Sequence, residues 1–210
     1  MTLAEKPRIS ARKSPKQGRS EQLVAAILEA AVQVLTDEGA RRFTTARVAE
    51  RAGVSVGSLY QYFPNKESIL FRLQADEWRE TGAMIEAILT DTRRPPQERL
   101  RHVVTAFIRS ECEEAAVRIA LDDAAPLYRD APETRAHRMS GSRTLIAFMR
   151  ELMPDAGDAE RRLTADLFSM SLKAVGKEVS EDGRPPEAVT AISQAMGDMF
   201  CAYLDRGRPA

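Results

Sequence analysis

Side chains that suit the binding of phosphate groups and base edges gather in one stretch of the chain, from Thr44 to Lys66. Hydroxyl and phenol groups form hydrogen bonds with phosphate oxygens, and an amide can pair with the edge of a base. This is the chemistry of recognition rather than of catalysis. The candidate binding residues that this chemistry suggests are Arg47, Val56, Gly57, Tyr60, Gln61 and Tyr62.

Enzymatic and metal chemistry have no comparable signal. The chain has no G-x-S-x-G, no H-E-x-x-H and no glycine-rich phosphate loop, and it has only two histidines. A carboxylate-based hydrolase among the 31 acidic residues is the alternative, but no pair of carboxylates stands out. Cys112 and Cys201 lie far apart in the chain, so neither a disulfide framework nor a zinc site is expected. We predict no enzyme, no cofactor and no metal.

Basic residues are concentrated at the start of the chain, although acidic and basic residues balance overall at 31 each. Residues 1–19 carry six basic side chains against one acidic side chain, two prolines and few large apolar residues. This composition predicts a flexible basic arm that contacts a polyanion, with a solvated tail as the alternative. No apolar run is long enough to span a bilayer and no secretory signal is evident, so we expect a cytoplasmic protein without membrane contact.

Two short helices joined by a tight turn are indicated around Gly53. Thr44 and Ser55 each offer a side-chain oxygen to unpaired backbone N–H groups, which suits the first position before a helix. Gly53 lies between them, where a sharp turn requires a positive φ that a Cβ disfavours. Ala49 precedes this glycine by four residues and Leu59 follows it by six, which lets the helices cross closely. The spacing is typical of a helix-turn-helix.

The rest of the chain is also predicted to be helical. Leu23, Ile27 and Val34 recur at three- and four-residue spacing, Gly39 ends that first helix, and Asn65 caps a later one. No five-residue segment alternates convincingly between apolar and polar residues, so the predicted fold is all-α. Further helices are expected over residues 66–88, 95–113, 117–123, 132–154, 158–180 and 186–205.

Several motifs in the first 80 residues carry a family resemblance. They are the entry Phe43-Thr44-Thr45, the segments Val48-Ala49 and Ala52-Gly53-Val54-Ser55, and the run Leu59-Tyr60-Gln61-Tyr62-Phe63-Pro64-Asn65-Lys66-Glu67. With them, residues 20–80 resemble the N-terminal DNA-binding domain of the TetR family of bacterial transcriptional regulators. The resemblance implies an all-α protein with a basic arm (1–19), a three-helix helix-turn-helix DNA-binding domain (20–66) and a larger helical ligand-binding and dimerisation domain (67–210).

The second helix of a helix-turn-helix lies in the major groove, and here this recognition helix is predicted over Val56–Phe63. Gln61 is suited to adenine N6 and N7, Val56 to a thymine methyl group, and Gly57 to close approach of the backbone. Arg47 is expected to reach a phosphate or a base. Phosphate contacts are assigned to Tyr60 and Tyr62 by their hydroxyls and, by resemblance, to Thr45, Ser55, Ser58 and Lys66.

One recognition unit makes few specific contacts, so a two-fold dimer that reads a palindrome is expected. The resemblance implies that the last two helices pair with their copies and that a small molecule binds among the middle helices. For the dimer residues and the pocket residues alike, the alternative is packing within the chain's own core. The predicted dimer residues are Leu167, Met170, Ala174, Ile192, Met196, Met199, Phe200 and Tyr203. The predicted pocket residues are Trp78, Phe107, Cys112, Tyr128, His137, Phe148, Met149, Phe168 and Met170.

The resulting prediction is a homodimeric, sequence-specific transcriptional regulator. Its partners would be double-stranded DNA with a palindromic operator and an unidentified small-molecule effector. We expect a repressor that the ligand releases, because repression is the commoner outcome in the family, although the sequence does not distinguish it from an activator. The alternative is a helix-turn-helix architectural DNA-binding protein without ligand control, which the long chain after the helix-turn-helix disfavours.

Overall fold

The computed structural model describes residues 18–127 and 143–205, and every regular element within these ranges is a helix. The chain divides into two compact units, which we call the head (residues 1–78 and 116–135) and the body (79–115 and 136–210). The predicted all-α fold is confirmed. The division falls within a helix near residue 78, whereas the sequence placed the domain boundary at residue 66. No helix in the described ranges is both long and apolar enough to cross a bilayer.

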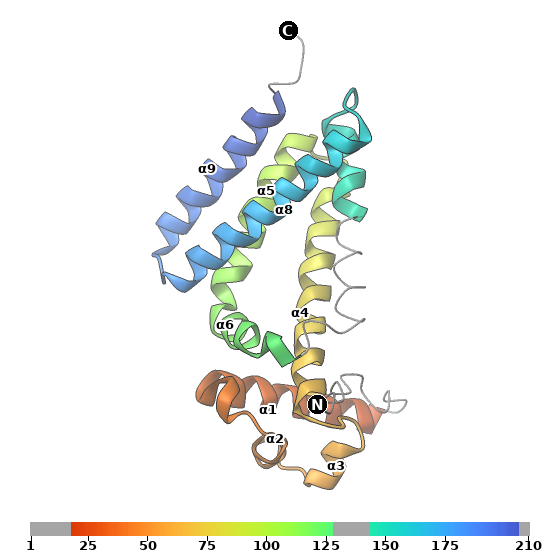
Figure 1. Cartoon of the computed structure of the whole chain (residues 1–210), viewed down its shortest axis with the longest axis vertical. Coiled ribbons are helices and arrows are strands. Elements are labelled where there is room, and N and C mark those ends of the chain that lie inside the picture. The colour runs from red at the N-terminus through yellow and green to blue at the C-terminus, as the bar shows by residue number, and fades with distance from the viewer. Residues whose placement is uncertain (1–17, 128–142, 206–210) are drawn as a thin grey trace, which may run out of the picture. The chain divides into compact units, whose positions relative to one another are not determined.

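The head contains α1 (Gly18–Arg42), α2 (Thr45–Arg51), α3 (Val56–Tyr60), the first part of α4 (Lys66–Leu89) and most of α6 (Ala115–Ala124), followed by the 3-10 turn η1 (Ala125–Leu127) (Figure 1). The regular course of α1 is broken at Gly39, whose φ of 75° is in the left-handed region, as its predicted role as a helix stop requires. A single core joins α1 to the start of α4, and its largest fully buried members are Ile27, Leu35, Phe43, Leu59, Phe63, Ile69, Leu70 and Leu121.

Helix α6 packs into the head core, which the sequence had not indicated. Ala120, Leu121 and Ala124 are buried in the same cluster as the residues of α1 and α4. Arg118 on α6 forms an ion pair with Glu77 on α4 at 2.6 Å, and both side chains are largely buried. The amide of Gln74 donates to the other oxygen of Glu77 at 2.8 Å. This paired charge fixes α6 against α4 within the head.

The body is built around α5 (Pro96–Glu113), which packs against both α8 (Asp158–Glu181) and α9 (Pro186–Asp205) (Figure 1). Residues 143–152 are also helical, within the predicted helix that ends at Pro154. Phe168 and Phe200 join α8 to α9 through an edge-to-face contact with ring centroids 4.7 Å apart. The remaining core includes Leu100, Val103, Val104, Phe107, Ile108, Phe148, Met149 and Leu172.

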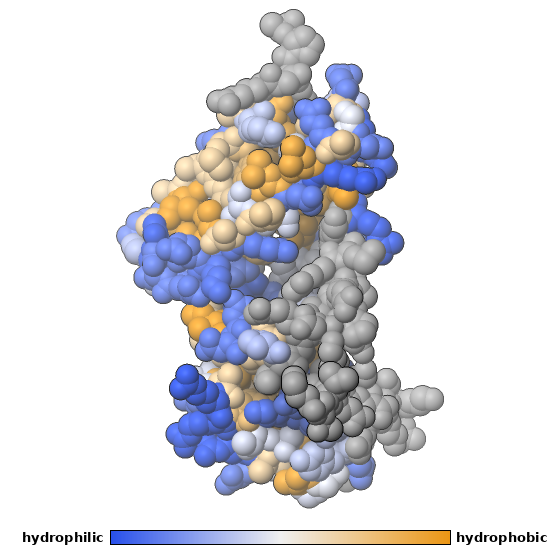
Figure 2. Space-filling view, viewed as in Figure 1, coloured by the Kyte–Doolittle hydropathy of each residue, from blue (hydrophilic) through white to orange (hydrophobic). Residues whose placement is uncertain are grey.

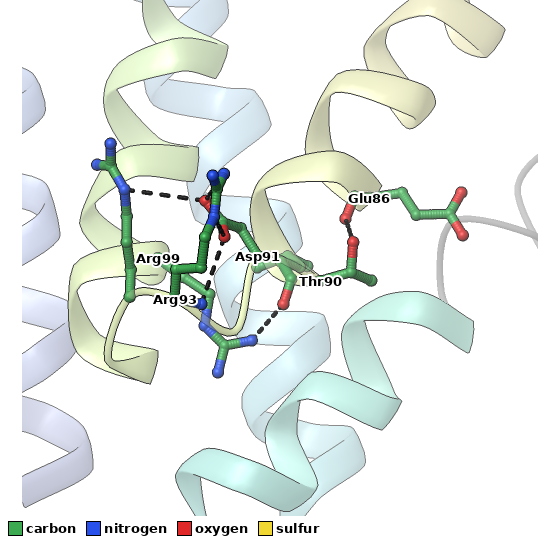
Figure 3. Close-up of polar contacts among 7 residues, drawn as sticks. Glu86, Thr90, Asp91, Arg93 and Arg99 are labelled. Carbon is green, nitrogen blue, oxygen red and sulfur yellow. Dashed lines mark hydrogen bonds and ion pairs between the residues drawn. The ribbon is translucent and has the colours of Figure 1, made fainter.

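A buried arginine holds the end of α4 in the body. Arg99 donates to the carbonyl oxygen of Leu89, the last residue of α4, and pairs with Glu151 from the helical segment 143–152. Its guanidinium lies 5.1 Å from the ring centre of Phe148. In the adjoining turn, shown in Figure 3, the hydrogen bond from Arg93 holds the pKa of Asp91 below its usual value.

Two glycines allow α5 to approach its neighbours closely. A Cβ at Gly176 of α8 would lie 2.9 Å from the ring of Phe107 and 3.0 Å from Cγ of Glu111. A Cβ at Gly197 of α9 would lie 3.1 Å from Cγ of Arg101. Real Cβ contacts are rarely as short as the first of these, and a buried ring has little room to move.

We therefore predict that Gly176→Ala lowers the stability of the body. Overpacking of this kind costs about 1–3 kcal/mol, which outweighs the ~0.5–1 kcal/mol that alanine gains over glycine in a helix. Urea unfolding followed by circular dichroism measures the difference. The matched control is Gly82→Ala on α4, where a Cβ meets nothing within 4 Å, so this variant should be slightly more stable than the parent. Equal stabilisation by both substitutions would contradict the close packing of α8 on α5.

Candidate nucleic-acid interface

Helix α2 begins where the sequence predicted. Thr44 is extended, and its side-chain oxygen accepts a hydrogen bond from the backbone N–H of Arg47 at 3.3 Å. The helix is only seven residues long and buries two of them, Val48 and Ala49. Ala49 is thus the small residue at the crossing of α2 with its neighbours, as its spacing before Gly53 indicated.

The turn between α2 and α3 is closed by backbone hydrogen bonds. Gly53 has a φ of 66°, and its N–H donates to the carbonyl of Glu50 at 3.1 Å. The N–H of Val54 donates to Ala49 at 2.9 Å. Ser55 then caps α3, accepting from the N–H of Ser58 at 3.0 Å. The predicted turn glycine and the predicted cap are both confirmed.

Helix α3 is shorter than predicted. It spans Val56–Tyr60 rather than Val56–Phe63, because the chain turns at residues 61 and 62. Phe63 then enters the core, and the ring of Pro64 prevents continuation of a helix. The next helix, α4, is capped by Asn65, whose Oδ1 accepts from the N–H of Ser68 at 2.8 Å. This cap was predicted.

An uncharged surface is exposed on α3 and the turn that follows it. Val56 and Tyr60 are each 39% exposed, and Gly57 and Gln61 are exposed beside them, while Leu59 is fully buried beneath. The hydroxyl groups of Tyr60 and Thr45 lie 3.1 Å apart, which links the end of α3 to the start of α2. Of the ten predicted binding residues, this surface and its edges bring together Thr45, Ser55, Val56, Gly57, Ser58, Tyr60 and Gln61.

Three other predicted binding residues are placed differently. Tyr62 is only 6% exposed and packs in the head core, so its ring does not share the exposed surface of Tyr60. Arg47 is half-buried and pairs with Glu38 near the end of α1. Lys66 is half-buried at the first position of α4. The Glu38 pairing had no signal in the sequence, since it depends on how α1 and α2 pack.

The predicted pocket residues fall into four groups. Phe107, Phe148, Met149 and Phe168 are buried in the body core, and Cys112 packs at its margin. Trp78 packs against the head core. Met170 is 70% exposed on α8. Tyr128 and His137 lie outside the described residues.

An apolar surface is exposed on the outer sides of α8 and α9, where hydrophobic residues gather in Figure 2. We call it the α8–α9 stripe. Five of its members are Leu163, Leu167 and Met170 on α8 and Met199 and Tyr203 on α9, and Ala174 is exposed in the same register. Of the other predicted dimer residues, Ile192 is half-buried, and Met196 and Phe200 are buried in the chain's own core.

Neither cysteine has the lowered thiol pKa of a reactive cysteine. Burial raises the pKa of the Cys112 thiol and also that of the Cys201 thiol, so both stay protonated at neutral pH. Within the described ranges, no group of three or more histidine, cysteine, aspartate or glutamate side chains is arranged to hold a metal. The site that the described residues do form is a helix-turn-helix whose second helix exposes an uncharged surface.

A helix-turn-helix head followed by a separate helical body defines a class of transcriptional regulators. Residues 27–73 match the family described as bacterial regulatory proteins, tetR family, and residues 95–206 match the tetracyclin repressor-like C-terminal domain. The second match alone covers more than half of the chain. The protein therefore belongs to the TetR family of DNA-binding transcriptional regulators.

Individual relatives support the same assignment. The chain is 25% identical over 179 residues to the HTH-type transcriptional regulator BetI of Cronobacter sakazakii, covering 84% of this chain and 89% of that one. It is 36% identical over 67 residues to the fatty acid metabolism regulator protein of Bacillus subtilis, covering 32% and 33% of the two chains. Among solved structures, FadR from Bacillus subtilis in complex with stearoyl-CoA superposes with a TM-score of 0.68 at 20% identity, over 85% of this chain and 97% of that one.

Gly53 gives a direct test of the turn. Gly53→Ala places a Cβ at a φ of 66°, which costs about 1–2 kcal/mol, and should lower the urea midpoint of the head. The fluorescence of Trp78, the single tryptophan, reports on this unit because it packs against the head core.

The matched control for this experiment is Gly57→Ala on α3. A Cβ there meets only Ser55 Oγ at 3.8 Å, an ordinary contact, so the midpoint should not fall. A head that tolerated both alanines equally would not contain the left-handed turn described here.

Proposed function

We propose that the protein is a dimeric repressor that binds a palindromic operator and leaves it when a small molecule binds the body. The observation that carries the proposal is the exposed face of α3, held by two capped helices and the turn at Gly53, on a chain of the TetR family. Leu59 is the buried residue of α3, so the side chains of this face are not part of the head core. Its exposed side chains are available to contact base edges in the major groove of a DNA duplex.

The chemistry of the surface supports reading of bases with few contacts. Gln61 carries an amide suited to the edge of adenine, and Val56 carries methyl groups suited to a thymine methyl. Gly57 lacks a side chain and lets the backbone approach DNA. Phosphate contacts are proposed for hydroxyl groups around this face and for the ammonium group at the start of α4, namely those of Thr45, Ser55, Ser58, Tyr60 and Lys66.

So small a recognition surface requires a second copy for specificity, and the α8–α9 stripe supports a two-fold dimer. Met170 and Met199 are 70% and 58% exposed, although both are apolar. Large exposed apolar side chains that gather on one face of a chain are typical of interaction surfaces. A two-fold interface uses the same patch on both copies, and it would present two recognition helices to two half-sites.

The body is the proposed ligand-binding unit. Four phenylalanines and two methionines belong to its buried core, and such side chains adapt readily to apolar ligands. The relatives differ in the chemistry that their names record: one protein is a fatty acid metabolism regulator, one structure was solved in complex with stearoyl-CoA, and one protein, from Escherichia coli, is a tetracycline repressor. Helix α4 belongs partly to each unit, so a ligand that displaces its body half has a covalent route to the head.

Selection of bound fragments from the source organism's sheared genomic DNA, at near-physiological salt, tests the proposal. Enrichment of a short palindrome supports a dimeric operator-binding regulator, and the genes beside it indicate the chemical class of the ligand. Retention of fragments without a common sequence would favour an architectural DNA-binding protein instead. Release of the enriched fragment by a metabolite extract, and not by buffer, would support control by a ligand.

Gln61→Ala should relax discrimination at one base pair in each half-site. Loss of a bidentate amide contact is worth about 1–3 kcal/mol at the matching base and nothing at the others. Binding to a panel of single-substitution operator duplexes measures this. Lys66→Ala is the comparison, because loss of a phosphate contact should weaken binding to every duplex alike. An equal loss across the panel for Gln61→Ala would remove it from base reading.

Charge placed on the α8–α9 stripe should dissociate the dimer. The double substitution Leu167→Glu and Met199→Glu removes two apolar side chains per copy from the proposed interface, each worth about 1.5–3 kcal/mol when buried. Both positions are exposed in the single chain, so the fold should persist by circular dichroism.

Light scattering coupled to size-exclusion chromatography gives the mass of this variant. The control is Gln194→Glu, a polar and exposed position on α9, which should stay dimeric. A double variant that keeps the parent mass would place the interface elsewhere.

A further inference from the structure

Charged side chains join the end of α1 to α2 in two pairs. Arg47 on α2 pairs with Glu38 on α1, and Arg51, one turn later on α2, donates to Asp37 at 3.0 Å and to Gln33 at 3.4 Å. Arg47 and Arg51 therefore point to the same neighbouring helix. Together with Val34, Glu38 and Glu50 they line a polar surface groove of about 610 Å³.

The two pairs differ in how far they are removed from water. The side chain of Glu38 is 21% exposed and its Oε2 is excluded from solvent, whereas Asp37 is largely exposed. A carboxylate oxygen without access to water needs a positive partner, because its unpaired charge is costly. Arg42 also lies 3.7 Å from this oxygen, but it is exposed and belongs to the same helix as Glu38. Arg47 is the partner that ties Glu38 to a second helix.

We propose that Arg47 is a positioning residue: with Glu38 it sets the orientation of α2, and through α2 that of the recognition helix, instead of contacting DNA. This inference rests on the proposed function. Helix α2 buries only Val48 and Ala49, so apolar packing restrains its rotation weakly. Glu38 directly precedes Gly39, where the regular course of α1 is broken. The Glu38–Arg47 pair therefore joins α2 to the last regular turn of α1.

Orientation passes from α2 to α3 through contacts already described. The turn hydrogen bonds from Gly53 and Val54 and the contact between the hydroxyls of Thr45 and Tyr60 connect the two helices. Helix α3 has five residues and one buried side chain, so it has little hold of its own. A tilt of α2 would therefore displace Val56 and Gln61, the side chains proposed to read bases.

Salt and sequence dependence separate a positioning residue from a phosphate contact. Each neutralised phosphate contributes about 0.9 to the slope of log affinity against log salt, and it does so on any sequence. A positioning residue leaves that slope unchanged and alters affinity for the specific site only. The loss of Glu38 changes DNA affinity in opposite directions under the two roles. If Glu38 positions Arg47, its loss disturbs α2 and weakens binding. If Glu38 competes with a phosphate for Arg47, its loss frees Arg47 for DNA and strengthens binding.

The experiment measures dissociation constants of the full chain for the selected site and for a scrambled duplex, by fluorescence anisotropy at several salt concentrations. The variants are Arg47→Met, Glu38→Gln and both together, with Lys66→Met as a proposed phosphate contact. Arg150→Met, an exposed arginine of the body, is the matched control for the loss of one positive charge. Native-state hydrogen exchange of the α2 and α3 amides is measured on the same variants without DNA.

We expect Arg47→Met to weaken binding to the specific site by about tenfold, the effect of one lost base contact. Binding to the scrambled duplex and the salt slope should stay as in the parent, and α2 and α3 amides should exchange faster. Glu38→Gln should weaken binding to the specific site by a smaller factor than Arg47→Met does. The double variant should bind more tightly than Arg47→Met, because it no longer leaves a buried carboxylate with its main partner removed.

Other results would overturn the inference. Weaker binding of Arg47→Met to both duplexes with a slope reduced by about 0.9, as for Lys66→Met, together with tighter binding by Glu38→Gln, would make Arg47 a phosphate contact. Parent-like affinity and exchange in Arg47→Met would also overturn it. If the parent binds neither duplex, the proposed function fails, and the exchange rates alone then decide whether Arg47 orients α2.

Discussion

The burial of a few side chains beneath two very short helices is the constraint on which the head depends. Helices α2 and α3 have seven and five residues, and neither is long enough to be stable alone. They persist because Val48, Ala49 and Leu59 are buried against α1 and α4, and because Thr44 and Ser55 cap them. The left-handed turn at Gly53 brings the three buried side chains to one side. Every exposed group on α3 is displayed as a consequence of that packing.

The surface exposed on α3 carries no charged side chain, and the same packing decides which side chains form it. A five-residue helix with Leu59 turned inward leaves Val56, Gly57 and Tyr60 outward, with Gln61 just beyond its end. Arginines of the same region are engaged with carboxylates of α1, so they add to the stability of α2 more readily than to the charge of the surface. On the proposed function, long-range attraction to DNA would then come from elsewhere in the chain, while α3 would supply discrimination at short range.

Features that depend on neighbouring residues were predicted well from the sequence. Caps at Thr44, Ser55 and Asn65, and helix breaks at Gly39 and Gly53, each follow from local hydrogen bonding or a positive φ. The bounds of α5, α8 and α9 followed in the same way, since Pro96 and Pro186 begin helices that run as periodicity indicated.

Orientation around a helix or a turn was harder to predict. Tyr62 turned inward because α3 ends at Tyr60, two residues before it, and the chain changes direction there. Helix α9 is apolar on more than one side, so its sequence could not separate Met196 and Phe200, which face the chain's own core, from Met199 and Tyr203, which do not. The pairing of Glu38 with Arg47 and the packing of α6 in the head arise from contacts between separate helices, which no local pattern records.

The placement of α6 bears on how a ligand could act. The described chain passes between head and body within α4 and again where α5 is followed by α6. At the first passage Arg99 binds the last carbonyl of α4 inside the body, and at the second Arg118 binds Glu77 inside the head. In both places an arginine therefore holds a helix end or a helix within the unit that the chain has just entered. Within the described residues, a change in the body core thus has two covalent routes to the head. Because a hydrogen bond or an ion pair holds each route at a helix, displacement of whole helices is the expected means by which a ligand in the body would act on the head.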